Sequence, residues 1–347
     1  MKYIKLSLYL LFALLLFALL PERIGFATLW KTFYWDMEYV RDLLAQPGGL
    51  STLVTNFMVQ FMANRWTAAL LLALPCWLVC LGIDALICRW WPRLSTLVSA
   101  LAVAAGAWVL LCDGLSKTTA DKEFQTQMCQ LARRDWQQLA TNTKGTNNLL
   151  ELNLRNLAWA ELGQLPQHVM PQRGGDVLVV SSFQSPYVAA MVSEIYWTMG
   201  EVAMSQCYAF QANEKLGSLS PLLLKRLALT NIVYGQYDVA RKYLRWLQKS
   251  LFDRDWAETY LTKLSDEAVE ADPELRLKRR CIPGQNGFPS LRSVVYDLQQ
   301  IIASNPEHKT SAQYLDALKV IYPDIKKYET DNTPAAADDA ASSLYAQ

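Results

Sequence analysis

The sequence YGQYDVARKYLRWL, residues 234–247, decides the fold of the C-terminal part of this chain of 347 residues. Gly235 permits a tight turn between two helices because it lacks a Cβ atom. Tyr237 is placed to pack between those helices, and Ala240 is small enough to let them approach each other. The residues after the turn have the apolar spacing of an amphipathic helix. This stretch therefore predicts a helical hairpin that turns at Gly235.

Similar turns occur twice earlier in the chain, at Gly163 and Gly200, so that the three glycines are 37 and 35 residues apart. The Gly235 copy resembles the G-x-Y-x-x-A-x-x-[YF] pattern of a tetratricopeptide (TPR) hairpin. A nearly constant period indicates stacked hairpins, and we expect a TPR-like α-solenoid over residues 116–282. The first copy departs from the pattern because His168 stands where a small residue is expected. An irregular helical bundle whose turns use glycine is the alternative.

A TPR-like stack binds its partners along the concave face, which the first helix of each hairpin lines. Counted from the turn glycines, the predicted partner-binding groove contains Asn153, Tyr187, Glu194, Trp197 and Lys225. Tyr187 and Trp197 are candidate apolar anchors for an extended peptide, and Lys225 is placed to receive a carboxylate. For Trp197 the alternative is packing between neighbouring repeats, because interface hot spots and protein cores both favour tryptophan.

The N-terminal region, residues 1–115, is strongly apolar and is interpreted as about three membrane-spanning helices at residues 4–20, 66–88 and 94–112. A cleaved signal peptide is the alternative for the first of them. Residues 21–65 form an amphipathic outer loop between the first two spans. The basic residues near Met1 and between the last two spans favour a multi-pass protein of the bacterial inner membrane whose C-terminal domain is extracytoplasmic.

The residues beyond the predicted repeats divide into two parts. Two prolines and two glycines after Cys281 indicate a linker, and residues 283–330 are predicted to contain two further amphipathic helices. Residues 331–347 are rich in Ala, Asp and Ser and are expected to be disordered. The basic run at residues 275–281, LRLKRRC, is interpreted as a solvated helix end, with contact to lipid phosphates as the alternative.

Charge and residue usage exclude several classes of function. The formal net charge is only +1, which argues against a dedicated nucleic-acid binder. The chain has two histidines without a partner at metal-ligand spacing, and it lacks a P-loop, a G-x-S-x-G motif and a dinucleotide fingerprint. We therefore predict no catalytic constellation, no metal and no cofactor. Cys129, Cys207 and Cys281 are odd in number and widely spaced, so in an extracytoplasmic domain one pair could form a disulfide and one thiol would remain.

Three segments carry a resemblance to a known family. They are RDLLAQPGGLSTLVTNFMVQF at residues 41–61, SEIYWTMGEVAMSQCYAFQA at residues 193–212 and LLLKRLALTNIVYGQYDVARKYLRWLQKSLF at residues 222–252. In these segments the chain resembles an uncharacterised family of bacterial multi-pass membrane proteins with a TPR-like helical domain. The resemblance implies a fold and a location and implies no known reaction.

These observations lead to three hypotheses of function. The first is a membrane-anchored, non-enzymatic scaffold whose helical domain binds a protein or peptide partner in the cell envelope. The second is an envelope enzyme, or a subunit of one, that acts on a lipid-linked sugar with Asp36 or Glu38 as the base. The third is a structural subunit of a larger membrane complex.

Overall fold

The computed structural model describes residues 21–61, 119–141, 148–180, 185–216, 219–283 and 294–323, with scattered positions among residues 6–14 and 66–101. Throughout these residues the protein is helical and contains no strand, as the all-α prediction required. The chain divides into two compact units, residues 1–129 and 130–347. The division predicted from the sequence, a membrane region that ends at residue 115 and a helical repeat domain after it, stays a prediction.

The first unit contains short helices, and α7 continues from it into the second unit. The helices are α2 (Pro21–Trp30), α3 (Met37–Leu44), α4 (Gly49–Gln60) and α7 (Thr119–Ala132). Helix α3 begins at Asp36, whose Oδ1 atom accepts hydrogen bonds of 3.0 Å from the backbone N–H groups of Glu38 and Tyr39. This is the usual way to satisfy the free donors of a first helical turn. Asp36, one of the two residues that the sequence suggested as a base, therefore serves as an N-cap.

The membrane prediction requires a correction. Helices α2, α3, α4 and α7 are 10, 8, 12 and 14 residues long, whereas about 20 residues are needed to cross the hydrocarbon core. Among the described residues, no helix is both long enough and apolar enough to span a membrane. The predicted spans at residues 4–20, 66–88 and 94–112 lie largely outside the described residues. This finding contradicts the prediction of transmembrane helices. It also contradicts the predicted multi-pass location in the inner membrane.

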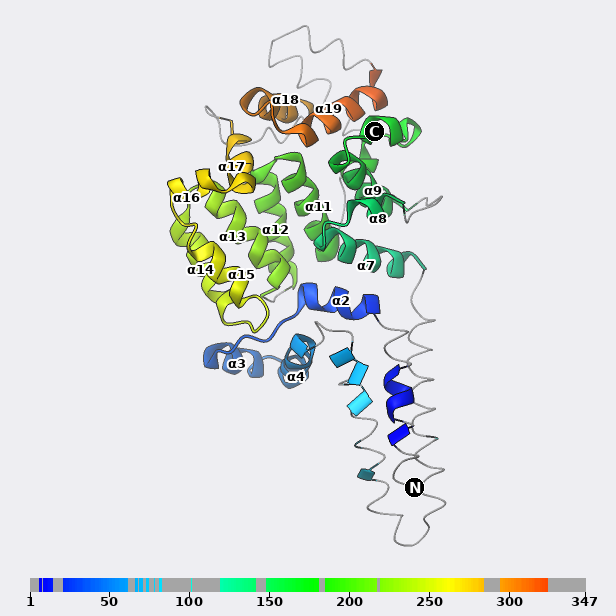
Figure 1. Ribbon diagram of the computed structural model, residues 1–347, viewed down its shortest axis with the longest axis vertical. Helices are drawn as coiled ribbons and strands as arrows, with labels where there is room; N and C mark the ends of the chain where they lie inside the picture. The colour runs from blue at the N-terminus through cyan, green and yellow to red at the C-terminus, as the bar shows by residue number, and fades with distance from the viewer. Residues whose placement is uncertain are drawn as a thin grey trace. The chain divides into compact units, whose positions relative to one another are not determined.

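The second unit is built from successive helices, of which α11 to α14 lie side by side as two hairpins (Figure 1). Helices α11 and α13 begin at a proline in the first turn, where the missing N–H has no cost. The helices are α8 (Trp136–Thr141), α9 (Leu149–Glu161), α10 (Leu165–His168), α11 (Pro186–Met199), α12 (Val202–Leu216), α13 (Pro221–Val233), α14 (Tyr237–Gln248), α15 (Arg254–Leu261), α16 (Asp266–Ala271), α17 (Pro273–Arg280), α18 (Val294–Ser304) and α19 (Lys309–Ile321).

The three glycines singled out in the sequence each follow a helix of this unit in the left-handed conformation. The φ angles are 74° for Gly163, 93° for Gly200 and 73° for Gly235. After Gly200 and Gly235 a second helix follows at once, and Ala240 is fully buried in α14. Each glycine thus ends its helix in a conformation that residues with a Cβ atom adopt only at a cost.

The segment after Gly163 does not form a second long helix. The short α10 is followed by two 3₁₀ turns, η2 (Pro171–Arg173) and η3 (Gly175–Val177). The prolines and glycines of this segment interrupt a helix, and His168 stacks on Trp159 with their ring centroids 3.7 Å apart. Asn153 fixes the segment, since its Nδ2 donates to the carbonyl of Asp176 at 2.7 Å. The described fold therefore has two full hairpins where the spacing predicted three.

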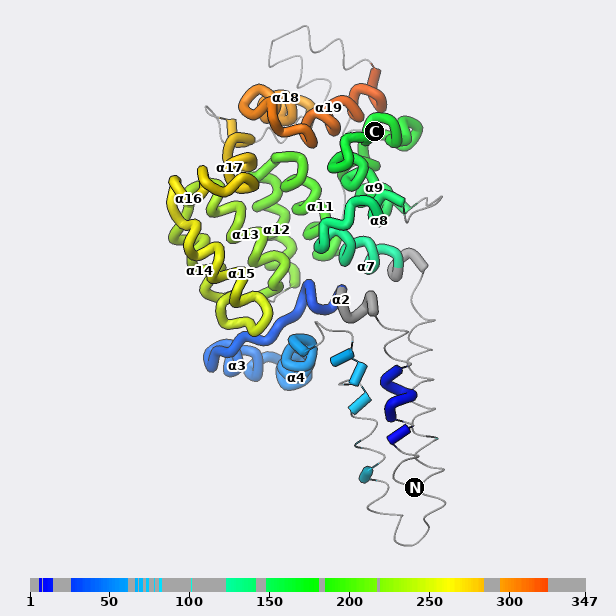
Figure 2. The backbone as a smooth tube through the Cα atoms, viewed as in Figure 1, coloured from blue at the N-terminus to red at the C-terminus, as the bar shows by residue number. Residues whose placement is uncertain are grey.

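The C-terminal helices lie across the ends of the hairpins at which the turns occur (Figure 2). Helix α17 packs on α13, while α19 packs on α11, α10 and α18. Asn305, in the connection from α18 to α19, donates to the carbonyl of Leu277 in α17 at 2.9 Å. As a result the turn at Gly200 is enclosed: a Cβ atom there would lie 3.1 Å from Cys281 Sγ and 3.2 Å from His308 Cε1.

We predict that Gly200→Ala lowers the free energy of unfolding by about 2–4 kcal/mol, because it combines left-handed strain with overpacking against Cys281 and His308. Gly235→Ala is the matched control, since its φ angle is also positive and nothing lies within 4 Å of the added Cβ. The control should lose only about 1 kcal/mol. Urea unfolding of the full chain measures both, and equal losses would contradict the enclosed turn.

Candidate partner-binding face

The inner layer of the candidate site is a buried aromatic and ionic contact between α11 and α13. The guanidinium carbon of Arg226 lies 4.2 Å from the centre of the Trp197 ring. The same guanidinium forms an ion pair with Glu194, which lies one turn before Trp197 on α11. A stacked and paired arginine of this kind is held rigidly, because its planar group meets both partners at once. This contact fixes α13 against α11.

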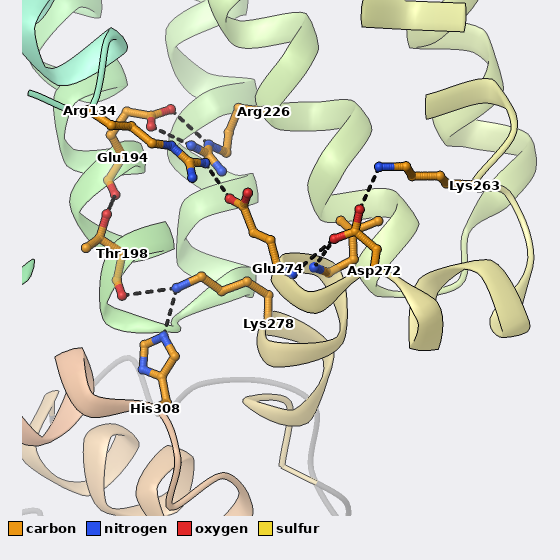
Figure 3. A network of polar contacts seen from close by, with 10 residues as sticks. Arg134, Glu194, Thr198, Arg226, Lys263, Asp272, Glu274, Lys278 and His308 are labelled. Atoms are coloured by element: carbon orange, nitrogen blue, oxygen red, sulfur yellow. Dashed lines mark hydrogen bonds and ion pairs between the residues drawn. The ribbon is translucent and has the colours of Figure 1, made fainter. Parts of the chain in front are cut away.

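A second buried cluster connects the end of α11 to α17 and α19, as Figure 3 shows. Lys278 Nζ donates to the carbonyl of Thr198 at 3.1 Å and lies 2.8 Å from His308 Nε2. His308 Nδ1 lies 2.5 Å from Ser311 Oγ, which donates to the carbonyl of Met199 at 2.6 Å. When Lys278 donates to Nε2, Nδ1 carries the proton of the neutral ring and donates to Ser311 Oγ; in this tautomer Nδ1 does not accept from the backbone N–H of Ser311, which lies 3.3 Å away.

Burial shifts the pKa of both basic groups of this cluster downward. Loss of hydration lowers the pKa of Lys278 to about 8. Burial, together with the nearby Lys278 ammonium, lowers the pKa of His308 to about 3. His308 is therefore neutral at physiological pH and accepts from Lys278. Although a lysine with a lowered pKa is a candidate nucleophile, this one is fully enclosed and hydrogen-bonded, so its contacts are structural.

The basic run at residues 275–281 contributes to the same packing. Arg279 donates from Nη2 to the carbonyl of Ile232 at 3.0 Å and from Nε to the carbonyl of Val233 at 3.1 Å. It also donates to the hydroxyl of Tyr237 at 2.8 Å. Together with Lys278, it turns inward to the last carbonyls of the hairpin helices. The interpretation of this run as a solvated helix end was therefore wrong for Lys278 and Arg279.

The outer layer is a row of two lysines and two aromatic rings, which we name the lysine–aromatic strip: Lys225, Trp256, Tyr260 and Lys263. Lys225 Nζ lies 5.4 Å from the centre of the Trp256 ring. The Trp256 and Tyr260 rings are 4.4 Å apart at their centroids, and Lys263 Nζ lies 4.6 Å from the centre of the Tyr260 ring. All four side chains are partly exposed, so the strip offers both ring surface and ammonium groups to a partner.

Ion pairs hold the strip and extend it. Lys225 pairs with Asp253 at 2.6 Å, and Lys263 pairs with Asp272 at 2.6 Å. Asp272 is also the N-cap of α17, which carries Glu274 two residues later. Glu274 in turn pairs with Arg134, from the turn after α7 (Figure 3). The strip thus runs without interruption from α13 over α15 to α17 and ends at Arg134.

The five predicted groove residues divide into two groups in the structure. Asn153, Glu194 and Trp197 make internal contacts: Asn153 holds the segment after α10, and Trp197 is buried under Arg226. The structure therefore places Trp197 as packing between neighbouring hairpins. Tyr187 and Lys225 are partly exposed. Of the five predicted groove residues, Lys225 is the one that belongs to the lysine–aromatic strip. Binding by Tyr187 and Lys225 remains a prediction.

Sequence reasoning missed most of the strip. Trp256, Tyr260 and Lys263 have the spacing i, i+4 and i+7, which places them on one face of a helix and its continuation. This signal is present in the sequence, but the predicted groove was defined by distance from the turn glycines and so did not include these residues. Arg134 carried no local signal, because its partner Glu274 is 140 residues away. Among the described residues, no cluster of three or more His, Cys, Asp or Glu residues has metal-binding geometry.

A buried carboxylic acid lies beside the cluster that Lys278 and His308 form. Glu201, directly after Gly200, is buried, and its Oε1 atom has no hydrogen-bond partner. Burial first, and the nearby carboxylate of Asp297 in α18 second, raise the pKa of Glu201 to about 8. Tyr234 and Cys281 are also near it. Glu201 is therefore held largely as the neutral acid at pH 7.

We predict that Glu201→Gln stabilises the protein at pH 8 and has little effect at pH 4. The folded state binds the Glu201 proton more tightly than the unfolded chain does, so its contribution is complete below pH 4.5 and is lost as pH rises toward 8. The amide mimics the neutral acid, and the expected gain at pH 8 is about 1 kcal/mol or more. Thermal unfolding against pH measures it, with exposed Glu214→Gln on α12 as control; no dependence on pH would contradict the assignment.

Comparison with known proteins adds a family and no activity. Two overlapping regions, residues 2–126 and 117–347, match a family described as a family of unknown function, DUF6057. No curated protein and no solved structure matches the chain. The two regions together cover nearly the whole sequence, and the chain therefore belongs to the DUF6057 family.

Proposed function

We propose that the second unit is a non-catalytic binding module that recognises a protein or peptide partner through the lysine–aromatic strip. The observation that carries this proposal is the contact between two aromatic rings, Trp256 and Tyr260, that lie between Lys225 and Lys263. Trp, Tyr and Arg are the residues most enriched at binding hot spots, and all three types occur along the strip and its end at Arg134.

The packing beneath the strip supports the same proposal. The Trp197–Arg226–Glu194 contact lies on α11 and α13, and the Lys225–Asp253 pair joins α13 to the start of α15. A strip held in this way loses little conformational entropy when a partner binds, which favours affinity. The contribution of the strip to folding is smaller, because each partly exposed cation–π contact stabilises by about 0.5–1 kcal/mol. Variants of the strip should therefore fold.

We predict that a photo-crosslinking amino acid at Trp256 captures one defined protein in cells that produce the full chain. The same probe at Val239, an exposed position on α14, is the control and should not capture that protein. Tyr260→Ala, combined with the probe at Trp256, should lower the yield at least tenfold, as expected when a hot-spot ring is removed.

Circular dichroism and thermal unfolding establish that these variants are folded. Capture of the same proteins at Trp256 and Val239, or of none at Trp256 in the folded chain, would contradict the proposal. The hypothesis of an envelope enzyme with Asp36 or Glu38 as its base stays a prediction; in the structure Asp36 is the N-cap of α3.

A further inference from the structure

We infer that the partner of the lysine–aromatic strip is an acidic peptide segment with apolar side chains, and that Arg134 recognises one of its carboxylates. This inference rests on the proposed function and deepens it by naming the chemistry of the partner. Three observations carry it: which member of each ion pair faces solvent, what the carboxylates of those pairs already bind, and the backbone and side chain of Arg134.

In each ion pair along the strip the cation is more exposed than the carboxylate. The exposed fractions of the cationic and anionic side chains are 33% and 11% for Lys225–Asp253, 27% and 15% for Lys263–Asp272, and 60% and 34% for Arg134–Glu274. A partner that approaches the strip therefore meets ammonium and guanidinium groups before it meets carboxylates. Charge complementarity favours acidic groups on that partner.

Two of the carboxylates are also engaged from the inner side. Asp253 accepts a hydrogen bond from Ser250 Oγ at 2.8 Å, and it is buried. Asp272 accepts from the backbone N–H groups of Glu274 and Leu275 at 3.0 and 3.1 Å. These bonds hold the negative charges inward, so the outward positive charge is a fixed property of the fold.

Arg134 has features that its place in the fold does not require. It follows α7 at a φ angle of 56°, the only non-glycine residue with positive φ in the described part of the chain. Its N–H bonds to the carbonyl of Leu131 at 2.9 Å, which is a helix-ending position that favours glycine. The guanidinium uses Nη2 for Glu274, and the described residues provide it with no other hydrogen bond. Its remaining donors suit the two oxygens of a carboxylate.

The two rings define the rest of the partner. Trp256 and Tyr260 lie between Lys225 and Lys263 and offer partly exposed ring faces. An acidic group that bonds Arg134 or a lysine would leave its neighbouring side chains over these rings. Apolar side chains bury ring area there, whereas cationic ones would meet the lysines. The expected segment therefore alternates acidic with aliphatic or aromatic residues.

The test uses the full chain and a phage-displayed random peptide library. Peptides selected on the chain should be enriched in Asp and Glu beside apolar residues. A selected peptide, made synthetically, should bind Arg134→Gln about tenfold more weakly, as expected for loss of a charge-assisted hydrogen bond. Its binding should also weaken as the salt concentration is raised.

Arg245→Gln, at an exposed arginine of α14, is the matched control and should bind the peptide as the parent chain does. Lys225→Gln gives a second variant if Arg134→Gln does not fold.

The outcomes separate this inference from the proposed function. The inference is overturned if the selected peptides lack acidic residues, or if Arg134→Gln and Lys225→Gln leave their binding unchanged. If Trp256→Ala still weakens the binding of those peptides, the proposed function stands. Peptides insensitive to Trp256→Ala, or a library that yields no binder on the folded chain, overturn both. A dimer of the chain that Arg134→Gln dissociates would assign the face to a second copy and overturn the inference.

Discussion

The last carbonyl groups of α11 and α13 have no partner within their own helices, and the rest of the second unit depends on how they are satisfied. The final turn of any helix leaves such carbonyls free, and burial without a partner costs about 1–3 kcal/mol for each. Here Lys278 and Ser311 donate to the carbonyls of Thr198 and Met199 in α11, and Arg279 Nε donates to the carbonyl of Val233 in α13. Cations are also the favoured charge at this end of a helix. The side chains that satisfy the two hairpin helices thus come from α17 and α19.

This dependence extends to the binding face. Helix α17 is held at its end by Lys278 and Arg279, and its beginning carries Asp272 and Glu274. Those two carboxylates hold Lys263 and Arg134, the two cations at the far end of the strip. The position of the strip is therefore set by the buried cluster, although the cluster itself is closed to a partner. A single short helix carries both the internal support and the outer charges.

The sequence predicted local features and missed long-range ones, for a physical reason. The hairpin at Gly235 was visible because a turn glycine, an aromatic residue and a small residue act within a few positions of one another. The contact of the Arg226 guanidinium with the Trp197 ring was not visible in the sequence, because Arg226 lies on another helix and the contact depends on tertiary packing. The basic run was misjudged because composition alone does not show that Lys278 and Arg279 face carbonyls of other helices. The membrane interpretation relied on apolar composition, whereas the described helices of the first unit are too short to cross a bilayer.

Hydrogen–deuterium exchange of Lys278→Met in the full chain tests this account most directly. The substitution keeps an unbranched side chain, one heavy atom shorter, but leaves the carbonyl of Thr198 and Nε2 of His308 without their donor. Exposed Arg280→Met, two residues later on the same helix, is the control. The account predicts faster exchange at the end of α11, in α17 and in α19, and also between Thr262 and Glu274, where the strip meets α17. Faster exchange confined to the residues next to position 278, or the same change in both variants, would contradict it.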